Sequence, residues 1–122
     1  RSLIVSGDEG LDELSLAGGN EVALVSRSGF EMRRVDASVA GLAYAPVEAI
    51  RGGDAAHNAA ALTALLLGAP GPYRDAVLLN AAAALLVAGV GSGWHDRAAL
   101  AADALDSGRA KVLLERWIAL AV

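Results

Sequence analysis

One stretch of this sequence leaves little choice about its fold: the run AVLLNAAAALLVAG from Ala76 to Gly89. The run is shorter than the roughly 20 apolar residues that cross a bilayer, and Asn80 lies at its middle. It carries too few polar residues for a helix that lies on a surface. We therefore predict a core helix from about Arg74 to Ala88 that other elements cover on most of its faces.

The sequence on either side of this run predicts three more helices. Asp54 precedes AAHNAAALTALLL, so its carboxylate can accept from the free amides of a helix that ends near Gly68. A third helix is expected from about Asp96 to Asp106, which leaves His95 in a glycine-flanked loop. A fourth is expected from Arg109 to about Ala121, with one apolar face made of Leu113, Leu114, Trp117, Ile118 and Ala121.

The first part of the chain has the patterns of strands. Leu3 to Val5 is a short apolar run closed by Ser6 and Gly7, which predicts the end of a buried strand. Residues 21–35 predict a hairpin whose strands are separated by Ser28 and Gly29, and residues 36–53 predict a connecting segment. The fold class that follows is α/β, with part of a sheet packed against helices in a single domain of 122 residues, 1–122.

Composition excludes several kinds of partner and site. The net charge is -4 and the basic residues are scattered, whereas a surface that binds nucleic acid needs clustered Lys and Arg. We therefore expect no nucleic-acid partner, and no membrane partner because the apolar run is too short. The absence of cysteine excludes disulfides and thiolate metal sites and is compatible with a reducing cytosol.

The loop GDEGLDELSLAGGN, which follows the predicted strand, contains the sharpest candidates for chemistry. Ligands of open α/β sheets bind beyond the carboxyl ends of strands, where this loop is expected to lie. The adjacent carboxylates of Asp12 and Glu13 suit Mg²⁺, which takes one or two carboxylates together with water and phosphate oxygens. On the residues alone, the favoured interpretation is that the pair consists of solvated loop charges or of carboxylates at a helix start, and we interpret Asp8 and Glu9 in the same way.

The remaining polar side chains favour structural roles. We expect Asn58 and Asn80 to satisfy backbone groups, Asp54 to cap a helix, and Arg74 and Asp75 to begin one. His57 is expected on an exposed helix face, and His95 lacks the neighbours that a metal site needs. Arg33 and Arg34 should face opposite sides of a strand and therefore cannot both reach one phosphate.

Several segments together resemble the anthranilate phosphoribosyltransferases. The segment GDEGLDELSL from Gly7 to Leu16 is similar to the part of that family in which an Asp-Glu pair binds magnesium, and Asp12 and Glu13 fall on the pair. The segment from Arg51 to Leu85 matches a second motif, and ALDSGRAKVLLERW resembles the family's closing helices. Together the matches cover nearly the whole chain in the family's order.

This resemblance implies a fold, a reaction and a location. The fold would be the C-terminal part of the phosphoribosyltransferase and nucleoside phosphorylase-like α/β domain. The reaction would be the magnesium-dependent transfer of phosphoribosyl from phosphoribosyl pyrophosphate (PRPP) to anthranilate in tryptophan biosynthesis, performed by a cytoplasmic homodimer. The family's glycine-rich pyrophosphate loop and its anthranilate contacts belong to the preceding, amino-terminal part. We therefore expect no residues of this chain to be catalytic, and no activity from the chain alone.

Two other functions remain open at this point. The chain can be a catalytically silent binding module that keeps the fold, or it can belong to another phosphoribosyltransferase or a nucleoside phosphorylase. A chain that begins at RSLIV is expected to be a piece of a longer protein or a processed product. Alone, it should associate through an unpaired sheet edge, because unpaired strand groups recruit other strands.

Overall fold

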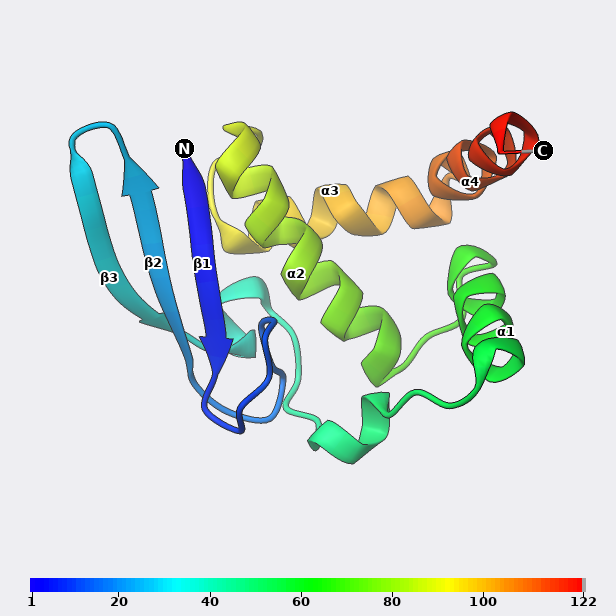
Figure 1. Cartoon of the computed structure of the whole chain (residues 1–122), viewed down its shortest axis with the longest axis horizontal. Helices are drawn as coiled ribbons and strands as arrows, with labels where there is room; N and C mark the ends of the chain where they lie inside the picture. The colour runs from blue at the N-terminus through cyan, green and yellow to red at the C-terminus, as the bar shows by residue number, and fades with distance from the viewer. Residues whose placement is uncertain (122) are drawn as a thin grey trace.

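The computed structural model describes residues 1–121 as one small sheet beside four α-helices (Figure 1). This arrangement confirms the α/β fold class. The strands and the two short 3₁₀ helices come first, and the α-helices follow. The bounds are β1 Ser2–Gly7, β2 Asn20–Ser26, β3 Gly29–Val35, η1 Ala37–Ala40, η2 Val47–Ile50, α1 Ala55–Leu66, α2 Pro72–Ala88, α3 Trp94–Asp106 and α4 Arg109–Leu120.

The sheet is an antiparallel meander in the order β1-β2-β3, so one edge of β1 has no neighbouring strand among residues 1–121. The predicted hairpin is confirmed, but its turn lies one residue earlier than expected. Ser26 pairs with Gly29, which leaves Arg27 and Ser28 as the turn. Gly29 has φ 126°, a conformation that side chains disfavour, and it begins β3 instead of closing the turn.

The two faces of the sheet differ, and this corrects the prediction that β1 is a buried strand. Leu3 and Val5 pack against the core, while Ile4 between them points outward and is 64% exposed. Ile4 is in register with Ala23 and Met32, and Phe30 lies nearby with 72% of its surface exposed. Since helices cover only one face of the sheet, alternate residues of β1 stay at the surface.

The core lies between the inner face of the sheet and α2, as the apolar run predicts. Leu79 and Ala82 of α2 are fully buried, and they pack in one cluster with Val22 of β2 and Ala98 of α3. The small side chains let α2 and α3 approach closely, and Gly89 ends α2 in the left-handed conformation with φ 73°. The expectation that α2 is covered on most faces is confirmed.

Two helices begin earlier than the sequence predicts. α2 begins at Pro72, because proline fits the first turn, where no intrahelical partner exists for its missing N–H. α3 begins at Trp94 because Gly93 is extended and the Asp96 carboxylate accepts from the backbone amide of Ser92 at 2.7 Å. His95 therefore lies in the first turn of α3 and not in a loop.

The segment between the sheet and α1 is more ordered than a simple connection. Asp36 caps η1, and its carboxylate accepts from both the hydroxyl and the backbone amide of Ser38. These hydrogen bonds, that of the hydroxyl first, hold the pKa of Asp36 below its ordinary value. The second turn, η2, ends at Ile50, and Arg51 separates it from the two glycines that precede α1.

α1 and α4, which we call the arm, lie at the end of the molecule away from the sheet (Figure 1). α1 reaches the core mainly through Leu65 and Leu66, which pack with Leu78 and Leu105. The apolar face predicted for α4 is solvent-exposed, with Trp117 at 70% exposure. No helix within residues 1–121 has the length and apolar character of a membrane span.

Candidate functional site

The loop after β1 folds back on itself through backbone hydrogen bonds. The amide of Gly7 donates to the carbonyl of Leu11 at 3.0 Å, and the amide of Gly10 donates to that of Gly7 at 2.9 Å. Gly10 has φ 86°, which glycine adopts without strain. The amide of Asp8 donates to the carbonyl of Gly19 at 3.0 Å and thereby joins the two ends of the loop. The carboxylate pair at positions 12 and 13 therefore sits on a closed loop.

Two asparagine side chains hold the loop immediately after that pair. The amide of Leu14 donates to Oδ1 of Asn80 at 2.9 Å, and Nδ2 of Asn80 donates to the carbonyl of Leu14 at 2.9 Å. The amide of Ser15 donates to Oδ1 of Asn20 at 2.6 Å, and Nδ2 of Asn20 donates to the carbonyl of Ser15 at 3.1 Å. Leu14, which packs in the core, and Ser15 are both buried.

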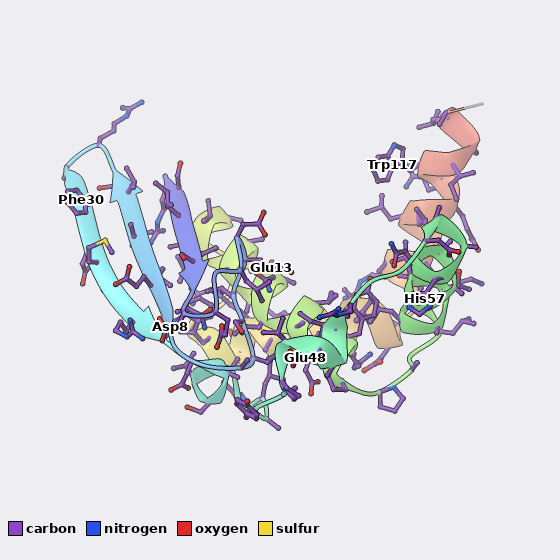
Figure 2. The ribbon with its side chains drawn as sticks, turned by 60° about the horizontal axis from the view of Figure 1, so that its bottom comes forward. Asp8, Glu13, Phe30, Glu48, His57 and Trp117 are labelled. Carbon is purple, nitrogen blue, oxygen red and sulfur yellow. The ribbon has the colours of Figure 1, made fainter. Side chains whose placement is uncertain are left out.

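Asp12 and Glu13 are both exposed, as a pair that meets a soluble ligand must be. Glu13 lines an open pocket of about 330 Å³ formed with η2 and the first half of α2, from residues including Ile50, Tyr73 and Asn80. Figure 2 shows Glu13 on the loop between the sheet and the helices. Asp12 is not among the residues that line this pocket. Glu13 thus lines the pocket, whereas Asp12 is adjacent to Glu13 in sequence and does not line it.

Asp8, interpreted as a solvated charge, has a defined partner. Nη2 of Arg34 donates to Oδ2 of Asp8 at 2.5 Å, and Glu21 lies 3.9 Å from the same guanidinium. The hydrogen bond to Asp8 is the main cause that raises the pKa of Arg34. Because all three groups are exposed, this pair contributes little stability. Its consequence is geometric, since it ties the start of the loop to β3.

Arg33 and Arg34 face opposite sides of β3, as predicted. Arg33 donates through Nε to Glu31 at 2.8 Å on the inner side, while Arg34 reaches the loop from the other. The hydrogen bond from Arg33 lowers the pKa of Glu31. These two arginines therefore do not form a joint phosphate site.

The other polar residues singled out in the sequence have the structural roles expected of them. The carboxylate of Asp54 caps α1 by accepting from the amide of His57 at 2.8 Å, and His57 is exposed. Oδ1 of Asn58 accepts from the amide of Gly53 at 2.9 Å. Arg74 and Asp75 lie in the first turn of α2, and Arg74 also pairs with Asp106 of α3 at 2.9 Å.

Asn20 is the one residue of this site that the sequence did not single out. It is fully buried and begins β2, directly after Gly18 and Gly19. An asparagine between a glycine pair and a strand can indicate a side chain that bonds local backbone, but this pattern is common in ordinary turns. Only the folded loop identifies its partners.

The donor set at positions 12 and 13 fits Mg²⁺ in kind but is small in number. No group of three or more His, Cys, Asp or Glu side chains gathers into a metal site anywhere in residues 1–121. Two neighbouring carboxylates are hard oxygen donors, and Mg²⁺ commonly keeps several waters and takes phosphate oxygens for the rest. A donor set of this size can hold such an ion only together with water or with phosphate oxygens of a ligand.

Comparison with known proteins gives consistent matches. The model of the glycosyl transferase family, a/b domain, matches residues 1–111. The anthranilate phosphoribosyltransferase of Erythrobacter litoralis is 66% identical over 122 residues, which are 100% of this chain and 37% of that protein. The chain therefore spans little more than a third of that relative's length.

Solved structures agree with the sequence matches. The crystal structure of anthranilate phosphoribosyltransferase from Thermus thermophilus has a TM-score of 0.87 and 41% identity, over 98% of this chain and 35% of that one. The enzyme of the same name from Saccharomyces cerevisiae, in complex with PRPP and Mg, has a TM-score of 0.82 and 28% identity, over 93% of this chain and 33% of that one. The resemblance seen in the sequence is thereby confirmed.

Proposed function

Because the chain belongs to the glycosyl transferase family, a/b domain, we propose that it is the C-terminal part of an anthranilate phosphoribosyltransferase. In this proposal the whole enzyme transfers phosphoribosyl from PRPP to anthranilate in tryptophan biosynthesis. The observation that carries it is the exposed pair Asp12 and Glu13, on a closed loop at the end of β1. Similarity to enzymes named for this reaction supports the choice of substrates.

In the proposed reaction, the amine of anthranilate attacks the anomeric carbon of the ribose and the bond to pyrophosphate breaks. Negative charge builds on the departing pyrophosphate, and Mg²⁺ bound to its oxygens would stabilise that charge. Asp12 and Glu13 would hold the ion from the protein side. The Saccharomyces cerevisiae structure in complex with PRPP and Mg supports the choice of ion.

The remaining machinery would come from polypeptide that precedes β1 in the family. The resemblance assigns the glycine-rich pyrophosphate loop and the anthranilate contacts to that part, so we expect the chain alone to be inactive. We also propose that the complete enzyme is a cytoplasmic homo-oligomer, as the resemblance implies. The open pocket beside Glu13 is consistent with a site that needs more polypeptide to close.

Calorimetry tests the role of the carboxylate pair. The chain is titrated with PRPP in the presence of Mg²⁺, and the titration is repeated with the single variants Asp12→Asn and Glu13→Gln and with the double variant. We expect the apparent affinity of the double variant to be about tenfold lower than that of the parent, because each lost carboxylate removes an ion ligand. Equal binding by variant and parent would remove the metal role.

A matched control separates a specific effect from a general change in charge. Glu115 is an exposed carboxylate on α4, in the arm, and its ion-pair partner within residues 1–121 is Lys111 at 3.4 Å. Glu115→Gln should bind PRPP and Mg²⁺ as the parent does. If this variant weakens binding as much as Glu13→Gln, the response reflects net charge and not a site.

A catalytically silent binding module is the second candidate. The observation that favours it is the small number of ligands, since residues 1–121 offer only pairs of carboxylates and no larger cluster. Such a module would bind neither PRPP nor Mg²⁺, and all the titrations above would be flat. Transfer activity on adding the amino-terminal part of a relative as a separate chain would exclude it.

A further inference from the structure

Asn20 and Asn80 hold two consecutive residues, Leu14 and Ser15, from opposite sides. The side-chain amide of Asn80, on α2, exchanges two hydrogen bonds with Leu14, both 2.9 Å long. The amide of Asn20, on β2, does the same with Ser15 at 2.6 Å and 3.1 Å. Each side-chain amide thus makes the pair of hydrogen bonds that the backbone of a neighbouring strand would otherwise make. The loop is therefore held between the sheet and α2.

Asn80 is an unusual residue for its position in the helix. It is the single polar residue of the run from Ala76 to Gly89, and its neighbours build the apolar core. Its third hydrogen bond, from Nδ2 to the carbonyl of Ala76 at 3.0 Å, stays within α2. An alanine there would continue the helix more favourably. The bridge to Leu14, 66 positions away in sequence, is what the amide adds.

We propose that Asn80 is a positioning residue for the carboxylates of Asp12 and Glu13. Glu13 is joined directly to Leu14, so fixing the Leu14 amide also fixes the peptide that carries the backbone of Glu13. The Glu13 carboxylate then moves only through its own side-chain torsions, beside a pocket that Asn80 also lines. Carboxylates that are already ordered lose less conformational entropy when they bind an ion.

This inference rests on the proposed function, because it concerns the same carboxylates and the same ion. Asn80 lies on another element, the core helix α2, and its hydrogen bonds to Leu14 connect that helix to the loop. Asn80 does not touch the ion in this scheme. It acts through the backbone of Leu14, and the measurement must therefore report on the loop as well as on binding.

Asn58 provides a matched control within the same chain. Its amide makes the same pair of hydrogen bonds, from the amide of Gly53 at 2.9 Å and to the carbonyl of Gly53 at 3.1 Å. It lies on α1 and clamps the segment before that helix, not the loop after β1. Asn58→Ala therefore removes an equivalent clamp in a region where no effect on the carboxylates is expected.

The test is NMR spectroscopy of the 122-residue chain, with the parent, Asn80→Ala and Asn58→Ala compared. Hydrogen exchange of the Leu14 amide and ¹⁵N relaxation of Asp12 and Glu13 report the order of the loop. Mn²⁺, a paramagnetic substitute for Mg²⁺, is titrated in the presence of PRPP, and the free ion is counted by electron paramagnetic resonance. These readouts do not depend on catalytic activity.

We expect Asn80→Ala to speed exchange of the Leu14 amide at least about tenfold and to weaken Mn²⁺ binding by about tenfold, the scale of lost outer-shell support. Asn58→Ala should change neither. The proposal is overturned if Asn80→Ala leaves the loop as ordered as in the parent, or if Asn58→Ala weakens Mn²⁺ binding equally. If Asn80→Ala does not fold, Asn80→Asp is used for the loop measurements.

Asn80→Asp keeps an acceptor for the Leu14 amide and loses the donor to the carbonyls of Leu14 and Ala76. It should fold and give Asp12 and Glu13 greater mobility than in the parent, and unchanged mobility overturns the proposal. The parent titration judges the proposed function separately. If the parent does not bind Mn²⁺, the metal role of Asp12 and Glu13 fails, while the comparison of loop order still decides whether Asn80 positions them.

Discussion

The helices α2 and α1 are made of similar residues, yet one is buried and the other is not. Both consist mainly of alanine and leucine with one asparagine. α2 lies between the sheet and α3, so Leu79 and Ala82 have no exposed surface. α1 stands in the arm and buries only Leu65. Burial in this molecule therefore depends on where a helix lies between other elements, and not on its composition.

The same difference separates the polar contacts of the two regions. On the sheet side, Asn80 and Asn20 fasten a loop to the core through part-buried and buried hydrogen bonds. In the arm, Asn58 makes the same kind of bond to Gly53 at an exposed position. Hydrogen bonds exposed to water contribute less, because water competes for both partners. The loop of the candidate site is thus attached to the more stable region.

The largest predicted effect concerns the association of the chain through its two exposed apolar surfaces. Ile4 on β1 and Trp117 on α4 are exposed to a similar degree, 64% and 70%. Of these two elements, only β1, an edge strand of the sheet, also offers unpaired strand groups, so we expect the parent to associate with a roughly twofold rise in mass. Ile4→Lys should restore the monomer and Trp117→Lys should not. A monomeric parent in light scattering would contradict this prediction. So would dissociation of the associated form by Trp117→Lys and not by Ile4→Lys.

The second prediction compares the interiors of the two regions. Leu79→Ala should lower the free energy of unfolding by about 2–5 kcal/mol, because it opens a cavity in a fully buried position. Leu113→Ala, at an α4 residue that is 64% exposed, should change it by less than about 0.5 kcal/mol. Urea denaturation followed by circular dichroism measures both. Similar losses in the two variants would mean that α4 is covered in solution.

The third prediction concerns the cap of α1. Asp54→Ala removes the hydrogen bond to the amide of His57, a type of contact worth about 0.5–2 kcal/mol. Because α1 has few buried contacts, the loss should appear as local fraying of this helix. Hydrogen exchange should accelerate in the first turn of α1 and remain unchanged in α2. Parallel acceleration in α2 would show that the arm and the core unfold as one unit.

The smallest predicted effect is on the pH dependence of the sheet side. Hydrogen bonds from Arg33 and Ser38 lower the pKa of Glu31 and Asp36 in the folded chain. A carboxyl group whose pKa is lowered on folding stabilises the folded chain at pH values above its unfolded pKa. This contribution disappears as the pH falls through the folded pKa. For Glu31 the loss therefore occurs below pH 4.5, its ordinary pKa. Both groups are exposed, so the effect is small.

NMR titration of the two carboxyl groups measures this directly. Each midpoint should lie below the ordinary value of its residue type, 4.5 for Glu31 and 3.8 for Asp36. Arg33→Gln should return the midpoint of Glu31 toward 4.5 and leave Asp36 unchanged. A parent midpoint of Glu31 at or above 4.5 would show that the ion pair does not persist in solution.

Much of the fold could be predicted because local patterns are strong. The core helix, the cap at Asp54 and the hairpin follow from apolar runs and turn residues that act over a few positions. The exposed side of β1 could not be predicted from the three residues Leu3 to Val5. A short apolar run looks the same whether one face of the strand is buried or both. The number of layers that pack against the sheet determines how many faces are buried.

The residues of the candidate site can be predicted from the sequence, but their arrangement in space cannot. Asp12 and Glu13 were selected by residue type and by resemblance, and the metal role remains a prediction. That Asn80 satisfies a loop backbone was expected, but its partner Leu14 was not. Asn20 gave no distinct signal. Contacts between α2 and a loop so distant in sequence depend on the packed core, which periodicity does not encode.

The free edge of β1 also determines where a missing part of a site would arrive. A strand added parallel to β1 would run in the direction from Ser2 to Gly7 and end beside the loop that follows Gly7. Whatever loop came after that strand would then emerge next to Glu13. Two segments far apart in a polypeptide, or from two polypeptides, would share a single substrate there, and each would supply contacts that the other lacks.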